Sequence, residues 1–313
     1  MRIIKRIPLP LSGVMLGTLA LGTLLLAPLT EELRPAGRIA REFCGLLAVI
    51  MLVMLLLKLI AYPKAFASDM RKPVTAGISA TFPMALMIFS VYWKRIIGQA
   101  AEILWWFAIL MLCSIIVYFA VTFVFRLNLQ NVYAAYFVPF AGGNVAGLTG
   151  FAYGNYSVGT FFFWFGLAAV SVMLVIVTTR YIRYPKVDEP LEPLFCIYTA
   201  PVSLLTACYA EAVTPRNLVF LKTLMIIELV LYLIALTRAV RCLRLPFYPS
   251  LASLTFPFVI SPVAVKQVLI CSAEMGAPWP WLQFFLIVES TIAEIFVVYV
   301  IIQFMRFIFK RRR

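Results

Sequence analysis

The chain has 313 residues, of which 64% are hydrophobic and 13% are charged, and its formal net charge is +14. This composition excludes a soluble globular protein, because apolar runs of 18 or more residues are typical of membrane-spanning helices. The basic residues lie between these runs and at the C-terminus, so we interpret them as charges at an anionic membrane surface and not as a nucleic-acid interface.

Ten apolar segments follow one another along the chain, and each has the roughly 20 residues that a bilayer core requires. They are predicted at 9–28, 43–62, 74–93, 100–125, 132–151, 158–181, 191–210, 218–240, 250–271 and 281–309. The first segment follows Arg2, Lys5 and Arg6 like a signal peptide, but it is long and lacks a small-residue cleavage site. We therefore expect an all-α integral membrane protein, with a single transmembrane domain over residues 1–313 and ten transmembrane helices.

The connecting segments differ in their content of lysine and arginine. With the N-terminus in the cytoplasm, the outer segments hold only Arg34, Arg38, Arg41, Lys94, Arg95 and Arg216. The inner segments and ends hold far more, including Lys64, Arg71, Lys72, Arg126, Arg180, Arg183, Lys186, Arg238, Arg241, Arg244, Lys310 and Arg311 to Arg313. The positive-inside rule thus places both termini on the cytoplasmic side of the inner (plasma) membrane.

Five prolines form an internal repeat on the odd-numbered segments. They are Pro10, Pro83, Pro139, Pro201 and Pro257, separated by 73, 56, 62 and 56 residues. An intramembrane proline frees a carbonyl and kinks the helix, which is tolerated where that carbonyl meets protein or a water-filled cavity. We expect the odd helices to lie inside and the even ones outside, as five helical hairpins in a quasi-five-fold ring around a central pore.

The residues that flank these prolines are the predicted pore lining. The residues just before them should share one height in the membrane, namely Leu9, Phe82, Val138, Ala200 and Phe256. Phe82 and Phe256 are the only rings in this layer, and either can gate the pore as a dry constriction, although Phe82 can instead pack between helices. The remaining predicted lining residues are Ser12, Gly13, Gly17, Thr81, Pro83, Pro139, Thr199, Pro201, Thr255 and Pro257.

Five motifs, in order along the whole chain, resemble those of the tellurite-resistance/dicarboxylate transporter family, which includes bacterial TehA and the plant slow anion channels. They are Pro10-Leu11-Ser12-Gly13, Thr81-Phe82-Pro83, Phe137-Val138-Pro139, Thr199-Ala200-Pro201 and Thr255-Phe256-Pro257. Lys72 is a departure, because family members often have histidine before the proline that matches Pro73. The resemblance implies ten helices around a pore, a homotrimer, and a plug formed by a phenylalanine that matches Phe256.

The charges also favour anions over cations. The odd segments carry no carboxylate in their membrane interiors, whereas a cation path normally shows acidic groups. Glu228, Glu289 and Glu294 lie on the eighth and tenth segments, and Glu102 begins the fourth, so we expect them in contacts between helices, paired with basic residues such as Lys222 or Lys266. A carboxylate that faced the pore would instead favour proton-coupled transport.

Two functions remain after these exclusions. The first is an anion channel or uniporter for small inorganic or organic anions, and the alternative is a proton-coupled secondary exporter of sulfite, tellurite or C4-dicarboxylates. An enzyme is not expected, because the chain has no histidine, no cysteine pair with metal spacing and no phosphate loop or nucleophile motif. We expect no cofactor and no metal, and we expect the lipid bilayer as the surrounding partner.

Overall fold

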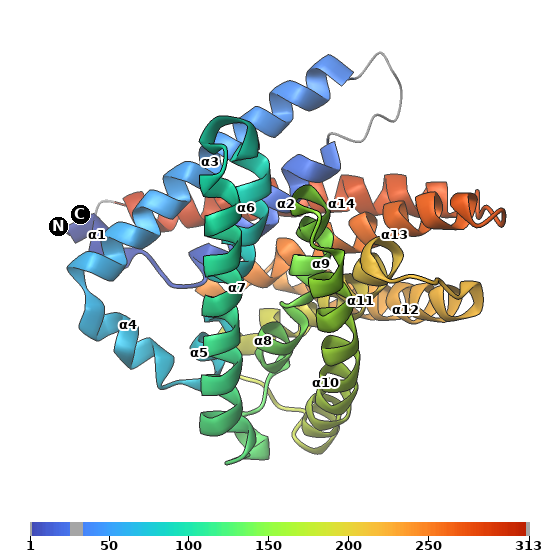
Figure 1. The fold of residues 1–313 in the computed structure, drawn as a ribbon. Coiled ribbons are helices and arrows are strands. Elements are labelled where there is room, and N and C mark those ends of the chain that lie inside the picture. Colours follow the sequence, from blue (N-terminus) through green and yellow to red (C-terminus); the bar gives the residue numbers. More distant parts are fainter. Residues whose placement is uncertain (1, 26–33, 311–313) are drawn as a thin grey trace.

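The computed structural model describes residues 2–25 and 34–310, and this part of the chain is helical, without a β-strand (Figure 1). Eight stretches within it are long and apolar enough to cross a membrane. They are α3 (Arg34–Ala61), α5 with α6 (Pro73–Ser79 and Thr81–Ile97), α7 (Ala100–Phe119) with the π-helical turn that follows it, α10 (Tyr156–Arg183), α11 (Thr199–Ala212) with the 3₁₀ segment before it, α12 (Leu218–Cys242), α13 (Phe256–Glu274) with the 3₁₀ segment before it, and α14 (Leu282–Phe309). The protein is therefore a multi-pass membrane protein.

The first and fifth expected spans are shorter or broken in this structure. The first contains α2 (Leu11–Leu25), and its expected end, residues 26–28, lies outside the described residues, as do the terminal cations Arg311 to Arg313. The fifth consists of two short helices, α8 (Phe137–Ala141) and α9 (Asn144–Gly150). Ten complete spans thus remain a prediction. Two further short helices, α1 (Arg2–Arg6) and α4 (Pro63–Met70), precede α2 and α5.

The repeat prolines mark helix starts, which corrects the expectation of kinks inside long helices. Pro83, Pro139 and Pro201 are the third residues of α6, α8 and α11, Pro257 is the second residue of α13, and Pro10 directly precedes α2. Proline fits the first turn of a helix because the N–H that it lacks would have no intrahelical acceptor there. Each inner element therefore begins a helix at its repeat proline, within the apolar part of the chain.

A short helical segment, of 3₁₀ geometry in three cases, precedes four of these starts. Residues Ala134–Tyr136, Glu189–Tyr198 and Pro249–Leu254 are 3₁₀ helices, and the short α5 ends one residue before α6. Side-chain hydrogen bonds join two of the 3₁₀ segments, since Ser250 Oγ donates to the Pro190 carbonyl at 2.5 Å and Ser253 Oγ donates to the Pro193 carbonyl. Just before the second segment, the Tyr248 hydroxyl donates to Glu189 at 2.9 Å, which raises the pKa of this tyrosine.

Neighbouring helices pack as hairpins, and the inner elements also pack against one another in a closed cycle. The hairpin pairs are α2 with α3, α6 with α7, α8 and α9 with α10, α11 with α12, and α13 with α14. In addition, α2 contacts α6, α6 contacts α9, α9 contacts α11, α11 contacts α13, and α13 returns to α2. Burial follows the same division. Of an apolar run of 18 residues in each stretch, 72–94% is buried for α6, α11 and α13, against 22–33% for α3, α7, α10, α12 and α14.

The exposed faces of the outer helices are apolar. On α7, for example, Ile103, Phe107, Leu110 and Val117 recur at helical spacing and are all more than half exposed. Such a face is stable in lipid, where the helix satisfies its own backbone hydrogen bonds. The sequence pattern therefore assigns these faces to the bilayer.

The two ends of the described chain meet (Figure 1). The Arg6 side chain donates a hydrogen bond to the carbonyl of Lys310, and α2 and α13 are in close contact. A Cβ atom on Gly17 would lie 2.8 Å from the backbone nitrogen of Phe256, so glycine is what allows this approach. The first and last hairpins are thereby joined.

Candidate functional site

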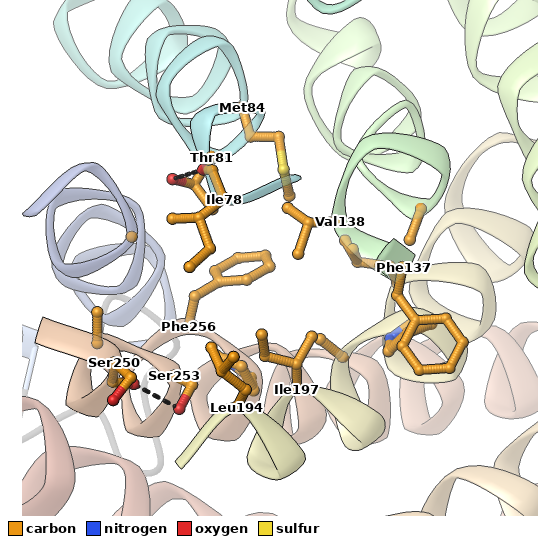
Figure 2. Close-up of a pocket in the computed structure, with 17 residues that line it drawn as sticks. Ile78, Thr81, Met84, Phe137, Val138, Leu194, Ile197, Ser250, Ser253 and Phe256 are labelled. Atoms are coloured by element: carbon orange, nitrogen blue, oxygen red, sulfur yellow. Dashed lines mark hydrogen bonds between the residues drawn. The ribbon is translucent and has the colours of Figure 1, made fainter. Parts of the chain in front are cut away.

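A central cavity lies where the inner helices begin (Figure 2). The N-terminal halves of α2, α6, α11 and α13, the end of α5, the short α8 and the 3₁₀ segments before α11 and α13 all contribute to its wall. Its lining residues are Gly13, Ile78, Thr81, Met84, Phe137, Val138, Ala141, Leu194, Ile197, Ala200, Pro201, Leu204, Ser250, Ala252, Ser253, Phe256 and Pro257. None of them is ionisable, so the wall is apolar apart from three hydroxyl groups and the backbone.

Phe256 occupies the middle of this cavity. Its ring projects between Ile78 and Val138 on one side and Leu194 and Ile197 on the other (Figure 2), and the residue is only 4% exposed. Phe256 is the first residue of α13, so its ring stands where the helix starts. The ring therefore projects into the cavity and narrows it.

The backbone before Phe256 is held by the first hairpin. Thr255 Oγ1 is close to two carbonyl oxygens, that of Ala252 at 2.7 Å and that of Gly13 at 3.1 Å. Gly17 packs directly against Thr255 and the Phe256 nitrogen. The start of α13 is therefore fixed to α2 by a side-chain hydrogen bond and by close packing.

The hydroxyl groups around the cavity are engaged with the protein itself. Thr81 Oγ1 lies 2.8 Å from the Ile78 carbonyl and 2.7 Å from Ser12 Oγ, and Ser253 Oγ lies 2.8 Å from the Ser250 carbonyl. Because the hydroxyl protons are directed to carbonyls or to each other, these groups offer an ion only weak dipolar contact. Such a wall can solvate a partly dehydrated ion without trapping it.

Seven of the predicted lining residues do lie at the cavity, namely Gly13, Thr81, Val138, Ala200, Pro201, Phe256 and Pro257. Six others lie outside its lining: Ser12, Gly17, Pro83, Pro139, Thr199 and Thr255. Ser12, Gly17 and Thr255 instead contact neighbouring inner helices. About half of the side chains named from the repeat thus face this cavity, and their role in lining a pore stays a prediction.

Leu9 and Phe82 line a different cavity, so the expected layer of five residues at one height is split. This second cavity lies between the first two hairpins and is also lined by Leu55, Lys58 and Tyr118, among others. Phe82 is the second residue of α6, whereas Phe256 is the first of α13, and one residue corresponds to a rotation of about 100° around a helix. On α6 it is the first residue, Thr81, that faces the central cavity.

None of the 3₁₀ residues in the wall was predicted from the sequence. Leu194, Ile197, Ser250, Ala252 and Ser253 lie in the two segments that precede α11 and α13. Their signal was the proline that precedes these two repeat motifs, Pro190 and Pro193 before Pro201 and Pro249 before Pro257, since proline disfavours regular α-helix. Ile78, Met84, Phe137, Ala141 and Leu204 were also not named, and only helical phase relative to the repeat proline would have indicated them.

The buried carboxylates are not paired with the basic residues that we expected. Glu228 and Glu289 are buried together and contact serine hydroxyls, while Lys222 lies over the Trp279 ring at 4.6 Å and Lys266 interacts with Glu211. The reason is position along the helix, since Glu228 and Glu289 face the seam between α11 and α13. Neither of them lines the central cavity. Glu102 is exposed, and Glu294 is partly buried near Cys44 of α3.

No group of three or more histidine, cysteine or carboxylate residues suited to a metal occurs in the described part of the chain. Its six cysteines, five of them buried, are free thiols.

Comparison with known proteins gives one family. The family model described as voltage-dependent anion channel, SLAC1, matches residues 6–308, which is nearly the whole chain. No curated protein matches the chain. The family resemblance found in the sequence motifs is thereby confirmed.

Proposed function

The chain belongs to the SLAC1 family of voltage-dependent anion channels, and we propose that it conducts small anions passively through the central cavity. The family implies anion transport of the channel type. The observation that carries the finer proposal is the cavity itself, an apolar space at the start of the inner helices that a single ring, Phe256, fills.

The pore of this proposal is a quasi-five-fold ring of inner elements, each covered by an outer helix. Two observations support it: the closed cycle of contacts that runs through α2, α6, α9, α11 and α13, and the deeper burial of the inner stretches. Assembly as a homotrimer in the plasma membrane, with both termini in the cytoplasm, belongs to the same proposal. The meeting of Arg6 with Lys310 and the excess of basic residues on one side support that placement of the termini.

Anion preference comes in this proposal from helix N-termini. The first turns of α2, α6, α11 and α13 border the cavity, and a helix N-terminus carries partial positive charge. The lining holds no carboxylate to oppose this field. A wall of oriented dipoles without a fixed cation attracts anions and still lets them leave, which conduction requires.

Phe256 is the gate in this proposal, and Phe82 is not. The Phe256 ring fills the cavity and keeps it dry, whereas Phe82 lies in the wall of the second cavity. Opening then requires the ring to leave its place between Ile78 and Leu194, which admits the water that a partly dehydrated anion needs.

A proton-coupled exporter is the second candidate, and the buried Glu228 and Glu289 are the observation that favours it. Passive conduction is supported better, because neither carboxylate borders the central cavity and neither is placed to exchange a proton with an anion there.

The discriminating experiment measures anion efflux from vesicles that contain the purified protein, with and without a pH gradient at fixed membrane voltage. We expect the anion gradient and the voltage alone to set the direction of net flux. Uphill anion movement driven by a pH gradient, at zero voltage and with equal anion concentrations, would establish the exporter and refute the passive channel.

A further inference from the structure

Four helices meet at a buried pair of carboxyl groups away from the central cavity. Glu228 on α12 and Glu289 on α14 are 0% and 1% exposed. Ser261 on α13 bridges them, since its Oγ is hydrogen-bonded to Glu228 Oε1 and lies 2.7 Å from Glu289 Oε2. Ser203 on α11 adds a contact of 2.9 Å to Glu228 Oε1.

The geometry of this bridge requires a proton on the pair. A serine hydroxyl has one hydrogen, so Ser261 can donate to only one of the two carboxyl groups. If both groups were ionised, the second would direct its lone pairs at the Ser261 oxygen at hydrogen-bond distance. A proton on one of Glu228 and Glu289, donated to Ser261, is the arrangement that satisfies both contacts.

Further polar atoms at the same place have no partner. Within the described residues, Glu228 Oε2, Glu289 Oε1 and the Tyr232 hydroxyl accept or donate no hydrogen bond, although all three are buried. Tyr232 follows Glu228 by one helical turn, so it lies on the same face of α12, and it interacts electrostatically with both carboxyl groups. The cluster thus has unused oxygen atoms that a change of protonation can engage.

The charged groups on the surrounding helices do not neutralise the pair. Glu211 of α11 interacts with Lys266 of α13, with Arg216 and with Glu274, and Lys222 of α12 lies over Trp279. The α2 segment, which also packs on α13 and α14, contains no titratable side chain. Full ionisation would therefore leave two like charges in an apolar setting without a cation, which is strongly unfavourable.

The cluster holds α13 at an interruption in that helix. Ser261 directly precedes Pro262, which removes one backbone hydrogen bond from the interior of α13. Closer to the start of the helix, the Tyr232 ring contacts the Phe258 ring, with 5.5 Å between centroids and an angle of 70°. Phe258 is two residues after Phe256, and Ser261 is five residues after it. The cluster therefore contacts α13 at two points within the first turns that follow Phe256.

We propose that Glu228 and Glu289 form a proton-binding site that keeps α13 in the position in which Phe256 fills the cavity. Loss of the bridging proton to water leaves two carboxylates around one hydroxyl, and their repulsion separates α12 from α14 and moves Ser261 with α13. Alkaline conditions then favour the open state. The inference rests on the proposed function, because it takes Phe256 as the gate.

The test uses the full chain in vesicles and measures the anion efflux rate over a range of pH, with equal pH on both sides. For the parent protein we expect the rate to rise with pH, by at most about tenfold per unit, which is the limit for linkage to one proton. The double variant Glu228→Gln/Glu289→Gln keeps hydrogen-bonding groups but cannot ionise, so its efflux should stay at the low-pH level. The control Glu294→Gln changes a carboxylate on α14 outside the cluster and should keep the parent's pH dependence.

A second readout does not depend on transport. Infrared difference spectra of the parent protein between low and high pH should show the carbonyl band of a protonated carboxyl, and the band should be absent from the double variant. If the double variant does not fold, the single variants Glu228→Gln and Glu289→Gln replace it in both measurements. Each should weaken the carbonyl band and the pH dependence of the efflux rate.

Three results would overturn the proposal: pH dependence that survives in the glutamine variants, a parent protein without a titrating buried carboxyl, or efflux that responds to Na⁺ at constant pH through the same two residues. The last result would assign the oxygen cluster to a sodium ion. A failure of the gate itself is separable, because Phe256→Ala would then leave efflux unchanged while the infrared titration of the pair persists.

Discussion

Replacing Phe256 by alanine removes the one ring that fills the central cavity, and we expect it to raise resting anion conductance strongly. A factor of ten in rate corresponds to about 1.4 kcal/mol of barrier, and we expect the loss of a ring that excludes both water and ion to exceed that factor. The cost to folding should stay at or below the lower end of the ~3–5 kcal/mol typical of a core phenylalanine. The reason is that the ring borders a cavity and makes none of the aromatic contacts found among the described residues.

Phe258 is the matched control for this substitution. It lies two residues further along α13, is fully buried, and contacts the rings of Tyr232 and Phe296 with centroids 5.5 and 4.9 Å apart. Phe258→Ala should therefore lose the full ~3–5 kcal/mol of a core site, and in the fraction that folds it should raise conductance far less than Phe256→Ala, because the Phe256 ring is still present.

The assay combines single-channel or vesicle efflux measurements with the yield and thermal stability of each purified variant. A third variant, Phe82→Ala, should raise conductance much less than Phe256→Ala, because its ring lies in the second cavity. The reasoning is refuted if Phe256→Ala folds normally and conducts no more than the parent protein. If it fails to fold while Phe258→Ala folds, the two rings have been assigned to the wrong roles.

Three further predictions concern topology, surface charge and helix approach. Reporter domains fused after Arg313 and within residues 153–157 should report opposite sides of the membrane, and a report from one side only would contradict the ten-span topology. Neutralising Arg71 and Lys72 should lower conductance mainly at low salt, since surface fields are screened within ~8 Å at physiological ionic strength. The selectivity order among anions should not change. A switch to cation selectivity would contradict the dipole origin of anion preference. Gly17→Ala should destabilise the protein by ~1–3 kcal/mol in thermal unfolding, because the added Cβ would lie 2.8 Å from the Phe256 nitrogen. Gly13→Ala should be tolerated, because the nearest neighbour of its Cβ would lie at 3.7 Å. Equal stability of the two variants would contradict the close approach of α2 and α13.

The sequence predicts the large-scale organisation well because the relevant signals are long. Apolar runs of about 20 residues identify eight of the ten expected spans among the described residues, and the proline repeat lies on the elements that the structure buries more deeply. The position of Phe256 followed from the same repeat together with the family motif. These features depend on composition over many residues, so an error of a few positions in a predicted boundary does not change the predicted arrangement.

The finer expectations failed where they depended on helical phase. A proline in an apolar run predicts either a kink or a helix start, and only the tertiary structure shows that the chain uses helix starts preceded by 3₁₀ segments. That difference of a few residues turns Phe82 away from the cavity and brings Ile197 and Ser253 to its wall. The bridge between Glu228 and Glu289 was equally out of reach, because it joins residues of four helices that have no common sequence signal.

The meeting of the first and last hairpins has a consequence for biogenesis. The hydrogen bond from Thr255 to the Gly13 carbonyl spans 242 positions of the chain, and Phe256 directly follows Thr255. During synthesis the N-terminal hairpin enters the membrane long before α13 exists, so the wall around Phe256 remains open on one side until translation is almost complete. A truncated chain that ends before α13 therefore lacks Phe256. The face of α2 that packs on α13 in the full chain is then left without its partner in the membrane. Because Arg6 and Lys310 are adjacent, joining the two ends and opening the chain at another connection on the same side preserves every one of these contacts.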